Sequence, residues 1–205
     1  MTRLFLPGED NTRYKQAGPT LKISDTDILL VPGYGDTPSG HWMMRWQAKM
    51  ANAWVVEQKN WFQPVRKVWQ EALEKRLEKT TRPVVLVGHS LGCILIAHAA
   101  HTLPKDKVRG AFLVAPTDLE RDAPKPAFDT GNFVPLPRAP LPFPAHVVAS
   151  RTDPHCAYER AEELAKAWSA TFQDAGEAGH INLESGRGPW PEGMMSFAYF
   201  MKRLG

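Results

Sequence analysis

The chain has 205 residues, which is enough for one domain to bury a substantial core without disulfides or a structural metal. Hydrophobic residues make up 43% of it and charged residues 23%, and the formal net charge of +3 is too small to indicate a nucleic-acid partner. The two cysteines, Cys93 and Cys156, are too few for a disulfide-rich secreted scaffold.

The first 26 residues are polar and show no periodicity, and we expect them to form an extended N-terminal arm in front of a single domain at residues 27–205. Residues 4–6 are apolar, but Pro7 and Gly8 end this patch before it reaches the length of a signal peptide or a membrane-spanning helix. We therefore expect a soluble cytoplasmic protein that contacts neither membrane nor nucleic acid.

Six short segments after the arm have the composition of β-strands. Four of them are nearly continuous apolar runs, the pattern of parallel strands that are covered by helices on both faces. Four further segments show the helical spacing of apolar residues. The predicted strands are residues 28–31, 54–57, 84–88, 111–115, 146–150 and 171–174, and the predicted helices are residues 64–77, 91–103, 159–168 and 194–204.

The alternation of strands and helices predicts an α/β fold, a doubly wound and mostly parallel sheet with helices on both faces. Right-handed crossovers would bring the loops after the strands together at the carboxyl edge of this sheet, where such folds hold their sites. Residues 119–144 interrupt the pattern, since they contain seven of the 18 prolines and no helical or strand period. Too little chain follows for a second domain, so we interpret this segment as a loop beside the site rather than a linker.

The most informative motif is a Gly-x-Ser-x-Gly sequence formed by Gly88, Ser90 and Gly92, directly after an apolar strand and directly before an apolar helix. In such an elbow the serine hydroxyl is exposed on a strained turn, and the glycines let the strand and the helix approach closely. The motif alone is weak, and an ordinary tight turn with a solvent-facing serine is the alternative. Its position between a strand and a helix favours Ser90 as a nucleophile.

A serine hydroxyl needs a base, and in this fold the acid and the histidine follow the serine in that order. His180 is the histidine in the right place, on a loop after the last strand. His155 lies only two residues from the candidate acid Asp153, and the remaining histidines come too early in the chain. Those are His41, His89, His98, His101 and His146.

Two aspartates are candidates for the acid that orients His180. Asp153 follows the fifth predicted strand and Asp118 follows the fourth, and either loop could reach the carboxyl edge. We favour Asp153 because the strand before the histidine-bearing strand is the commoner source in this fold. Asp118 would then be a helix cap or a loop residue.

The backbone N–H groups of Leu91 and Tyr34 are the expected donors to an oxyanion. Leu91 opens the helix after the nucleophile, and Tyr34 lies between Gly33 and Gly35 in the loop after the first strand. Cys93 lies one turn into the helix and is interpreted as a core thiol. The sequence shows no metal-ligand spacing, no phosphate-binding motif and no dinucleotide fingerprint, so we expect no metal and no cofactor.

Taken together, these segments resemble the small serine hydrolases of the retinoblastoma-binding-protein-9-like family, also called the YdeN-type α/β-hydrolases. The resemblance covers about residues 28–193. It rests on several blocks in combination: Val31-Pro32-Gly33-Tyr34-Gly35 with His41-Trp42, then Gln58 and Trp61 ahead of Pro64, Gly88-His89-Ser90-Leu91-Gly92-Cys93, Ser150-Arg151-Thr152-Asp153-Pro154-His155-Cys156, and Gly179-His180-Ile181-Asn182 with Gly188-Pro189-Trp190-Pro191.

The resemblance implies a compact α/β-hydrolase without a large lid, with weak carboxylesterase-type activity and a triad of Ser90, Asp153 and His180. It strengthens the choice of Asp153 over Asp118. The family name implies a protein partner for one member, but residues 91–95 lack the acidic end of a Leu-x-Cys-x-Glu motif, so nothing here supports such a partner. The resemblance implies no physiological substrate.

The sequence thus predicts a serine hydrolase that cleaves small carboxylic esters or related acyl compounds through an acyl-enzyme. A protein-binding module on a hydrolase scaffold is one alternative, although such a module would not need all three triad residues. Acyl transfer by the same residues is another. Trp42, Trp190 and residues 119–144 are candidates for the border of the substrate pocket, which suggests a modest apolar acyl group.

Overall fold

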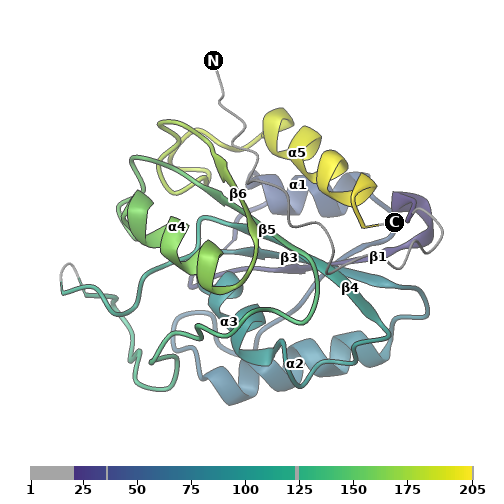
Figure 1. Ribbon diagram of the computed structural model, residues 1–205, viewed down its shortest axis with the longest axis horizontal. Coiled ribbons are helices and arrows are strands. Elements are labelled where there is room, and N and C mark those ends of the chain that lie inside the picture. Colours follow the sequence, from purple (N-terminus) through teal and green to yellow (C-terminus); the bar gives the residue numbers. More distant parts are fainter. Residues whose placement is uncertain (1–20, 36, 123–124, 205) are drawn as a thin grey trace.

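The computed structural model describes residues 21–35, 37–122 and 125–204 (Figure 1). The first 20 residues of the expected N-terminal arm lie outside this part of the chain. The end of the arm contains one turn of 3₁₀ helix, η2 (Ile23–Asp25), shortly before the first strand. No helix in the described ranges combines the length and the apolar character needed to cross a bilayer.

Six strands form one parallel sheet in the order β2-β1-β3-β4-β5-β6. This sheet confirms the predicted α/β class, and each strand lies close to its predicted position. The strands are β1 (Asp27–Val31), β2 (Ala53–Val55), β3 (Val84–His89), β4 (Val108–Val114), β5 (Ala145–Ala149) and β6 (Thr171–Asp174).

The four apolar runs of the sequence form the interior of the sheet. Every residue of β1 and β3 is buried, and so are all residues but one in β4 and in β5. The two edge strands, β2 and β6, are less completely covered. Because helices cover both faces, the central strands have no solvent side and do not alternate between apolar and polar residues.

Within the described residues, five helices cover the two faces of the sheet. They are α1 (Trp42–Lys49), α2 (Arg66–Glu78), α3 (Leu91–Ala99), α4 (Tyr158–Ala167) and α5 (Pro191–Lys202). Helices α2, α3 and α4 pack on one face against residues such as Leu29 and Leu86, whereas α1 and α5 pack on the other against Ile28 and Val85 (Figure 1). Successive strand residues point to opposite faces, so each central strand contributes to both cores.

Helix α1 is absent from the sequence-based prediction. Its buried residues are Trp42, Met43 and Trp46, too few within eight positions to establish a helical period. The residue that caps it is His41, whose Nδ1 accepts a hydrogen bond from the Met43 N–H at 3.2 Å. Histidine is not among the usual capping side chains, so the start of this helix carries no familiar sequence signal.

The strand order places the loops after β1 and β3 at a special point of the sheet. β1 lies between β2 and β3, so the chain continues to one side of β1 through β2 and to the other side through β3. Where the strand order reverses in this way, the two loops diverge, and doubly wound sheets bind their ligands there. Residues 32–35 follow β1, and Ser90 follows β3.

The proline-rich segment, residues 119–144, contains no helix or strand in its described part. Part of it packs against α2 and α3. Phe133 is buried and its carbonyl accepts a hydrogen bond from His98 Nε2 at 2.8 Å, and Asn132 Oδ1 accepts one from the N–H of Arg66 at 2.6 Å. The segment is therefore anchored to two helices between β4 and β5.

Candidate active site

Ser90 lies on the turn between β3 and α3, at the carboxyl edge of the sheet. Its backbone angles are φ 55° and ψ −124°, a conformation that costs a residue with a Cβ about 1–3 kcal/mol. The N–H of Ser90 donates to the carbonyl of Val114 at 3.0 Å, which ties the strained turn to the end of β4. The geometry is that of a nucleophile elbow, in which the hydroxyl is presented at the top of the sheet.

Two glycines allow the main chain to pack closely around this turn. A Cβ on Gly92 would lie 2.0 Å from the carbonyl oxygen of Val31, which no side chain could tolerate. A Cβ on Gly33 would lie 2.7 Å from the Ser90 Cβ and 3.1 Å from the Leu91 nitrogen. The loop after β1 is therefore in direct contact with the serine turn, and both positions require glycine for space.

His180 and Asp153 are paired next to this turn. The His180 Nδ1 lies 2.9 Å from both carboxylate oxygens of Asp153, and both side chains are almost completely buried. Because a carboxylate can only accept, Nδ1 carries the proton and Nε2 is left with a free lone pair. Asp153 also accepts the N–H of His155 at 2.8 Å, which fixes the orientation of the carboxylate.

The backbone of the His180 loop is fixed by two neighbouring side chains. His89 Nε2 lies 2.9 Å from the carbonyl oxygen of His180, and Trp42 Nε1 donates to the carbonyl of Ile181 at 2.9 Å. Burial lowers the pKa of His89 well below its ordinary value, and the nearby His180 and His41 lower it further. His89 is therefore neutral, and it donates from Nε2 to the His180 carbonyl.

The second candidate acid, Asp118, makes other contacts. Its Oδ1 accepts the N–H of Glu120 at 3.0 Å, and its Oδ2 lies 3.5 Å from Arg160 Nε. Its own N–H donates to the carbonyl of His155 at 3.0 Å. The structure thus brings Asp153 to His180, whereas Asp118 supports the loop that carries Asp153.

Ser90 and His180 are neighbours through His89. The His89 and His180 rings are 4.9 Å apart, and His89 directly precedes Ser90. Among the described residues, no hydrogen bond joins Ser90 Oγ to the His180 ring. Such bonds are often long before substrate binds and form only in the complex.

The two expected oxyanion donors belong to two segments that are in contact at the serine turn. Leu91 is the first residue of α3, so its N–H has no partner within the helix. The described residues offer no hydrogen-bond acceptor to the N–H of Tyr34 either. With Gly33 packed against Ser90, both N–H groups belong to the same small region, and the N-terminus of α3 adds a favourable dipole for negative charge.

Trp42 and Trp190, the expected pocket residues, lie in the core between the sheet and helices α1 and α5. Their exposed fractions are 0% and 6%, and their rings pack against each other at 5.2 Å. A side chain with this burial has no surface to offer a substrate in this structure. Trp42 supports the His180 loop through its hydrogen bond to Ile181, and Trp190 packs against Trp42.

The sequence analysis did not single out the aromatic side chains that reach the surface near Ser90. Tyr34 contacts Phe62 and Phe128, with ring-centroid distances of 5.9 Å and 4.7 Å. Gln58, in the loop after β2, was also not interpreted; it is buried, and neither of its amide atoms has a partner among the described residues. Tyr34 carried a sequence signal through its place in the glycine loop and Gln58 through the family resemblance, whereas Phe62 and Phe128 carried none.

Other reactive groups are poorly placed for chemistry. Both cysteines are unpaired and buried, and burial raises the pKa of Cys156 to about 12 and that of Cys93 further still. Within the described ranges, no group of three or more His, Cys, Asp and Glu side chains is arranged to bind a metal ion. The Cys93 thiol donates to the carbonyl of Val114, as expected of a core thiol.

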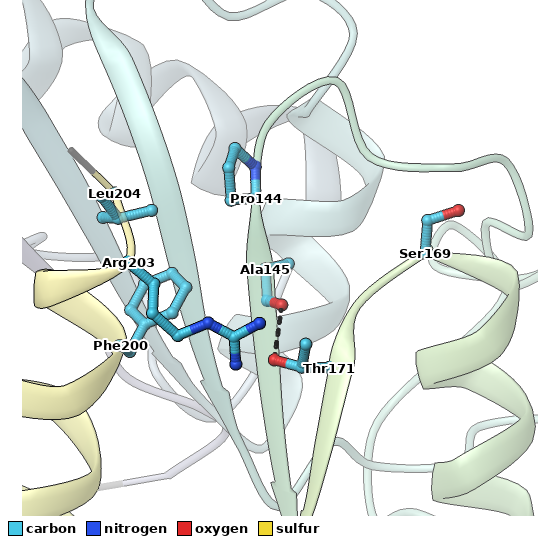
Figure 2. A pocket seen from close by; sticks show the side chains of 7 residues that line it. All are labelled: Pro144, Ala145, Ser169, Thr171, Phe200, Arg203 and Leu204. Atoms are coloured by element: carbon cyan, nitrogen blue, oxygen red, sulfur yellow. Dashed lines mark hydrogen bonds between the residues drawn. The ribbon is translucent and has the colours of Figure 1, made fainter. Parts of the chain in front are cut away.

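A cavity of about 300 Å³ lies at the opposite, amino edge of the sheet (Figure 2). It is lined by Pro144, Ala145, Ser169, Thr171, Phe200, Arg203 and Leu204. These residues come from the starts of β5 and β6 and from the end of α5, and none belongs to the Ser90 turn or the His180 loop. This cavity and the grouping of reactive side chains therefore lie at different edges, and the reactive side chains are the better guide to chemistry.

Comparison with known proteins identified one family model and a set of similar structures. A model described as serine hydrolase matches residues 28–199. A search of curated proteins found no match.

A YdeN-like hydrolase from Pectobacterium atrosepticum shares 32% sequence identity and has a TM-score of 0.76, covering 89% of this chain and 94% of its own. The ydeN gene product from B. subtilis has 20% identity and a TM-score of 0.65, with coverages of 85% and 98%. RedJ, a thioesterase from the prodiginine biosynthetic pathway of Streptomyces coelicolor, has 16% identity and a TM-score of 0.60, with coverages of 87% and 85%. At their lower identities, the last two show similarity of fold alone.

Proposed function

Starting from the fact that this chain belongs to the serine hydrolase family, as a YdeN-type member of the α/β-hydrolase superfamily, we propose that it cleaves small carboxylic esters or related acyl compounds through a triad of Ser90, His180 and Asp153. The thioesterase among the similar structures makes thioesters one such class of acyl compound. The observation that carries the proposal is that the strained Ser90 turn lies next to the buried His180–Asp153 pair.

In the first half of the reaction, Ser90 Oγ attacks the acyl carbonyl while His180 Nε2 takes its proton. The imidazolium is stabilised by the Asp153 carboxylate, which accepts from Nδ1 throughout. His180 then returns the proton to the leaving oxygen or sulfur, and the acyl group remains as an ester on Ser90. In the second half, His180 Nε2 takes a proton from water as the water oxygen bonds to the acyl carbon, and it returns that proton to Ser90 Oγ as the acyl–Ser90 bond breaks and the carboxylic acid is released.

The N–H groups of Leu91 and Tyr34 stabilise the negative charge that develops on the carbonyl oxygen. Donors of this kind contribute most when they are held in place before the reaction. Gly33 and Gly92 supply that rigidity, because they let β1, its loop and α3 pack directly against one another. Removing one such donor typically lowers kcat about 10²–10³-fold.

Labelling with a fluorophosphonate probe tests the nucleophile, because the probe forms a stable bond with an activated serine. We expect the wild-type protein to be labelled and Ser90→Ala to remain unlabelled. Ser169→Ala is the matched control, since Ser169 also has a positive φ, 54°, but lies at the other edge of the sheet. Equal labelling of wild type and Ser90→Ala would contradict the proposal.

A further inference from the structure

Three aromatic side chains from separate parts of the chain meet at the oxyanion loop. Tyr34 follows β1, Phe62 follows β2, and Phe128 belongs to the proline-rich segment after β4. The Phe128 ring stacks on Tyr34 with an interplanar angle of 23°, and the Phe62 ring meets Tyr34 edge-on at 81°. The loops are joined at this point, since the N–H of Gly35 donates to the carbonyl of Trp61 at 2.9 Å.

This aromatic cluster of Tyr34, Phe62 and Phe128 remains partly open to solvent. Phe62 is 58% exposed and Tyr34 37% exposed, and Phe128 is only half-buried. Scattered exposed apolar side chains are ordinary, but three rings from three loops that contact one another through Tyr34 form a contiguous apolar surface. Its contact with the oxyanion loop makes a substrate group the natural occupant of this surface.

The two faces of the sheet decide which part of the substrate would lie there. The His180 loop lies on the face that α1 and α5 cover, because Trp42 donates to the carbonyl of Ile181 and both residues belong to that core, whereas Phe128 packs against the core on the other face. The leaving group must be within reach of His180, because that residue protonates it, and it therefore lies on the same side. The acyl group extends the other way, toward the loops after β1 and β2 that carry Tyr34 and Phe62.

We propose that the aromatic cluster binds the acyl part of the substrate and makes the enzyme prefer esters of aryl-substituted acids over acetate esters. This inference rests on the proposed function. Aromatic rings favour edge-to-face and offset-stacked partners, and such contacts add to the gain from burying apolar surface. Tyr34 directly follows Gly33, which packs against Ser90, so the cluster begins one residue from the serine turn.

The test compares p-nitrophenyl phenylacetate with p-nitrophenyl acetate, which share a leaving group and differ only in the acyl part. We expect the wild-type enzyme to have the higher kcat/KM with phenylacetate. Phe62→Ala and Phe128→Ala should each lower the ratio of kcat/KM for phenylacetate to kcat/KM for acetate about tenfold, in keeping with the factors that apolar pocket contacts supply. Tyr199→Ala, an aromatic position on α5 with 63% exposure, is the control and should change neither.

The outcomes separate this inference from the proposed function. If both esters are hydrolysed only when Ser90 is present, but neither phenylalanine substitution changes the ratio of the two kcat/KM values, the aromatic cluster is not the acyl site. A wild-type enzyme that favours acetate would overturn the inference in the same way. If Ser90→Ala retains full turnover of both esters, the triad and the inference fall together.

Discussion

The carboxyl edge and the amino edge of the sheet each have a serine with a positive φ, and the residues around the two serines differ. At the carboxyl edge, Ser90 has φ 55° and neighbours the buried pair of His180 and Asp153. At the amino edge, Ser169 has φ 54° and lines an open cavity of about 300 Å³. The cavity has one strongly charged side chain, Arg203, which extends toward Ala145 and Thr171 (Figure 2).

The comparison shows that neither backbone strain nor cavity volume identifies a catalytic site by itself. Strain at Ser169 accompanies a turn between α4 and β6, with no base or acid among the residues that line the cavity. At the carboxyl edge the loops after β1, β3, β5 and β6 converge, so donors, nucleophile, acid and base gather in one place. A parallel sheet thus brings reactive side chains together at its carboxyl edge, even when a cavity lies at its amino edge.

The largest expected effect tests the contrast between the edges directly. Ser90→Ala should lower kcat for an ester by about 10⁶-fold, the scale known from removal of the serine in subtilisin. Arg203→Ala, which removes the charge from the amino-edge cavity, should leave kcat/KM within about twofold. Steady-state kinetics on the two purified variants checks both expectations. A large loss in Arg203→Ala would mean that the cavity takes part in catalysis.

The next effect concerns the acid within the carboxyl edge. Asp153→Asn should lower kcat by about 10⁴-fold, because the amide favours the wrong tautomer of His180 and cannot stabilise its charged form. Asp118→Asn should cost less than about tenfold in kcat, and about 1 kcal/mol in the free energy of unfolding through its contact with Arg160. Kinetics and urea unfolding measure the two quantities. If Asp118→Asn proves the more damaging to kcat, the acid comes from the loop after β4.

Much of this architecture follows from local sequence patterns. The apolar runs predict buried parallel strands, and the sequence at Gly88, Ser90 and Gly92 predicts the elbow because the strand and the helix on either side of it are themselves recognisable. Once the sheet is parallel, its topology brings His180 to the same edge as Ser90. The order of the strands and helices along the chain therefore predicts which side chains meet at the carboxyl edge.

What the sequence could not predict depends on contacts between distant segments. Both Asp118 and Asp153 follow strands that end at the same edge; the sequence favours Asp153, but the contacts of Asp153 with His180 and of Asp118 with Arg160 on α4 appear only in the structure. Trp42 and Trp190 are aromatic residues near the motifs, but their burial depends on how α1 and α5 pack. Phe128 lies in a segment without any period, and its stacking on Tyr34 has no local signature.

The carboxyl edge should also make the protein sensitive to acid. Burial, and secondly the nearby His180, lower the pKa of His41 from 6.5 to about 4. Between about pH 6.5 and pH 4, His41 therefore binds a proton in the unfolded chain but not in the folded protein. The free energy of unfolding falls as the pH drops through this range. The loss attributable to His41 is about 3 kcal/mol, at 1.36 kcal/mol per pKa unit.

His41→Asn should remove that part of the pH dependence, because asparagine can still cap α1 through the Met43 N–H but does not titrate. Urea unfolding at pH 7.5 and at pH 4.5 measures the difference for wild type and variant. His101→Asn, at an exposed position, serves as the control and should keep the wild-type difference. An unchanged difference in His41→Asn would place the acid sensitivity elsewhere.

The smallest effect compares one substitution at two places. Neither amide atom of the buried Gln58, after β2, has a partner among the described residues, whereas Gln173 on β6 accepts hydrogen bonds from His146 Nε2 at 3.1 Å and from the Ser196 hydroxyl. Gln58→Met should raise the free energy of unfolding by about 1 kcal/mol, since it replaces an unpaired buried amide with an apolar group of similar shape. Gln173→Met should lower the free energy of unfolding by about 1–2 kcal/mol, because it removes the acceptor of these hydrogen bonds. Urea unfolding of the two variants measures both signs. If Gln58→Met is as destabilising as Gln173→Met, the Gln58 amide has a partner in solution and carries no such cost.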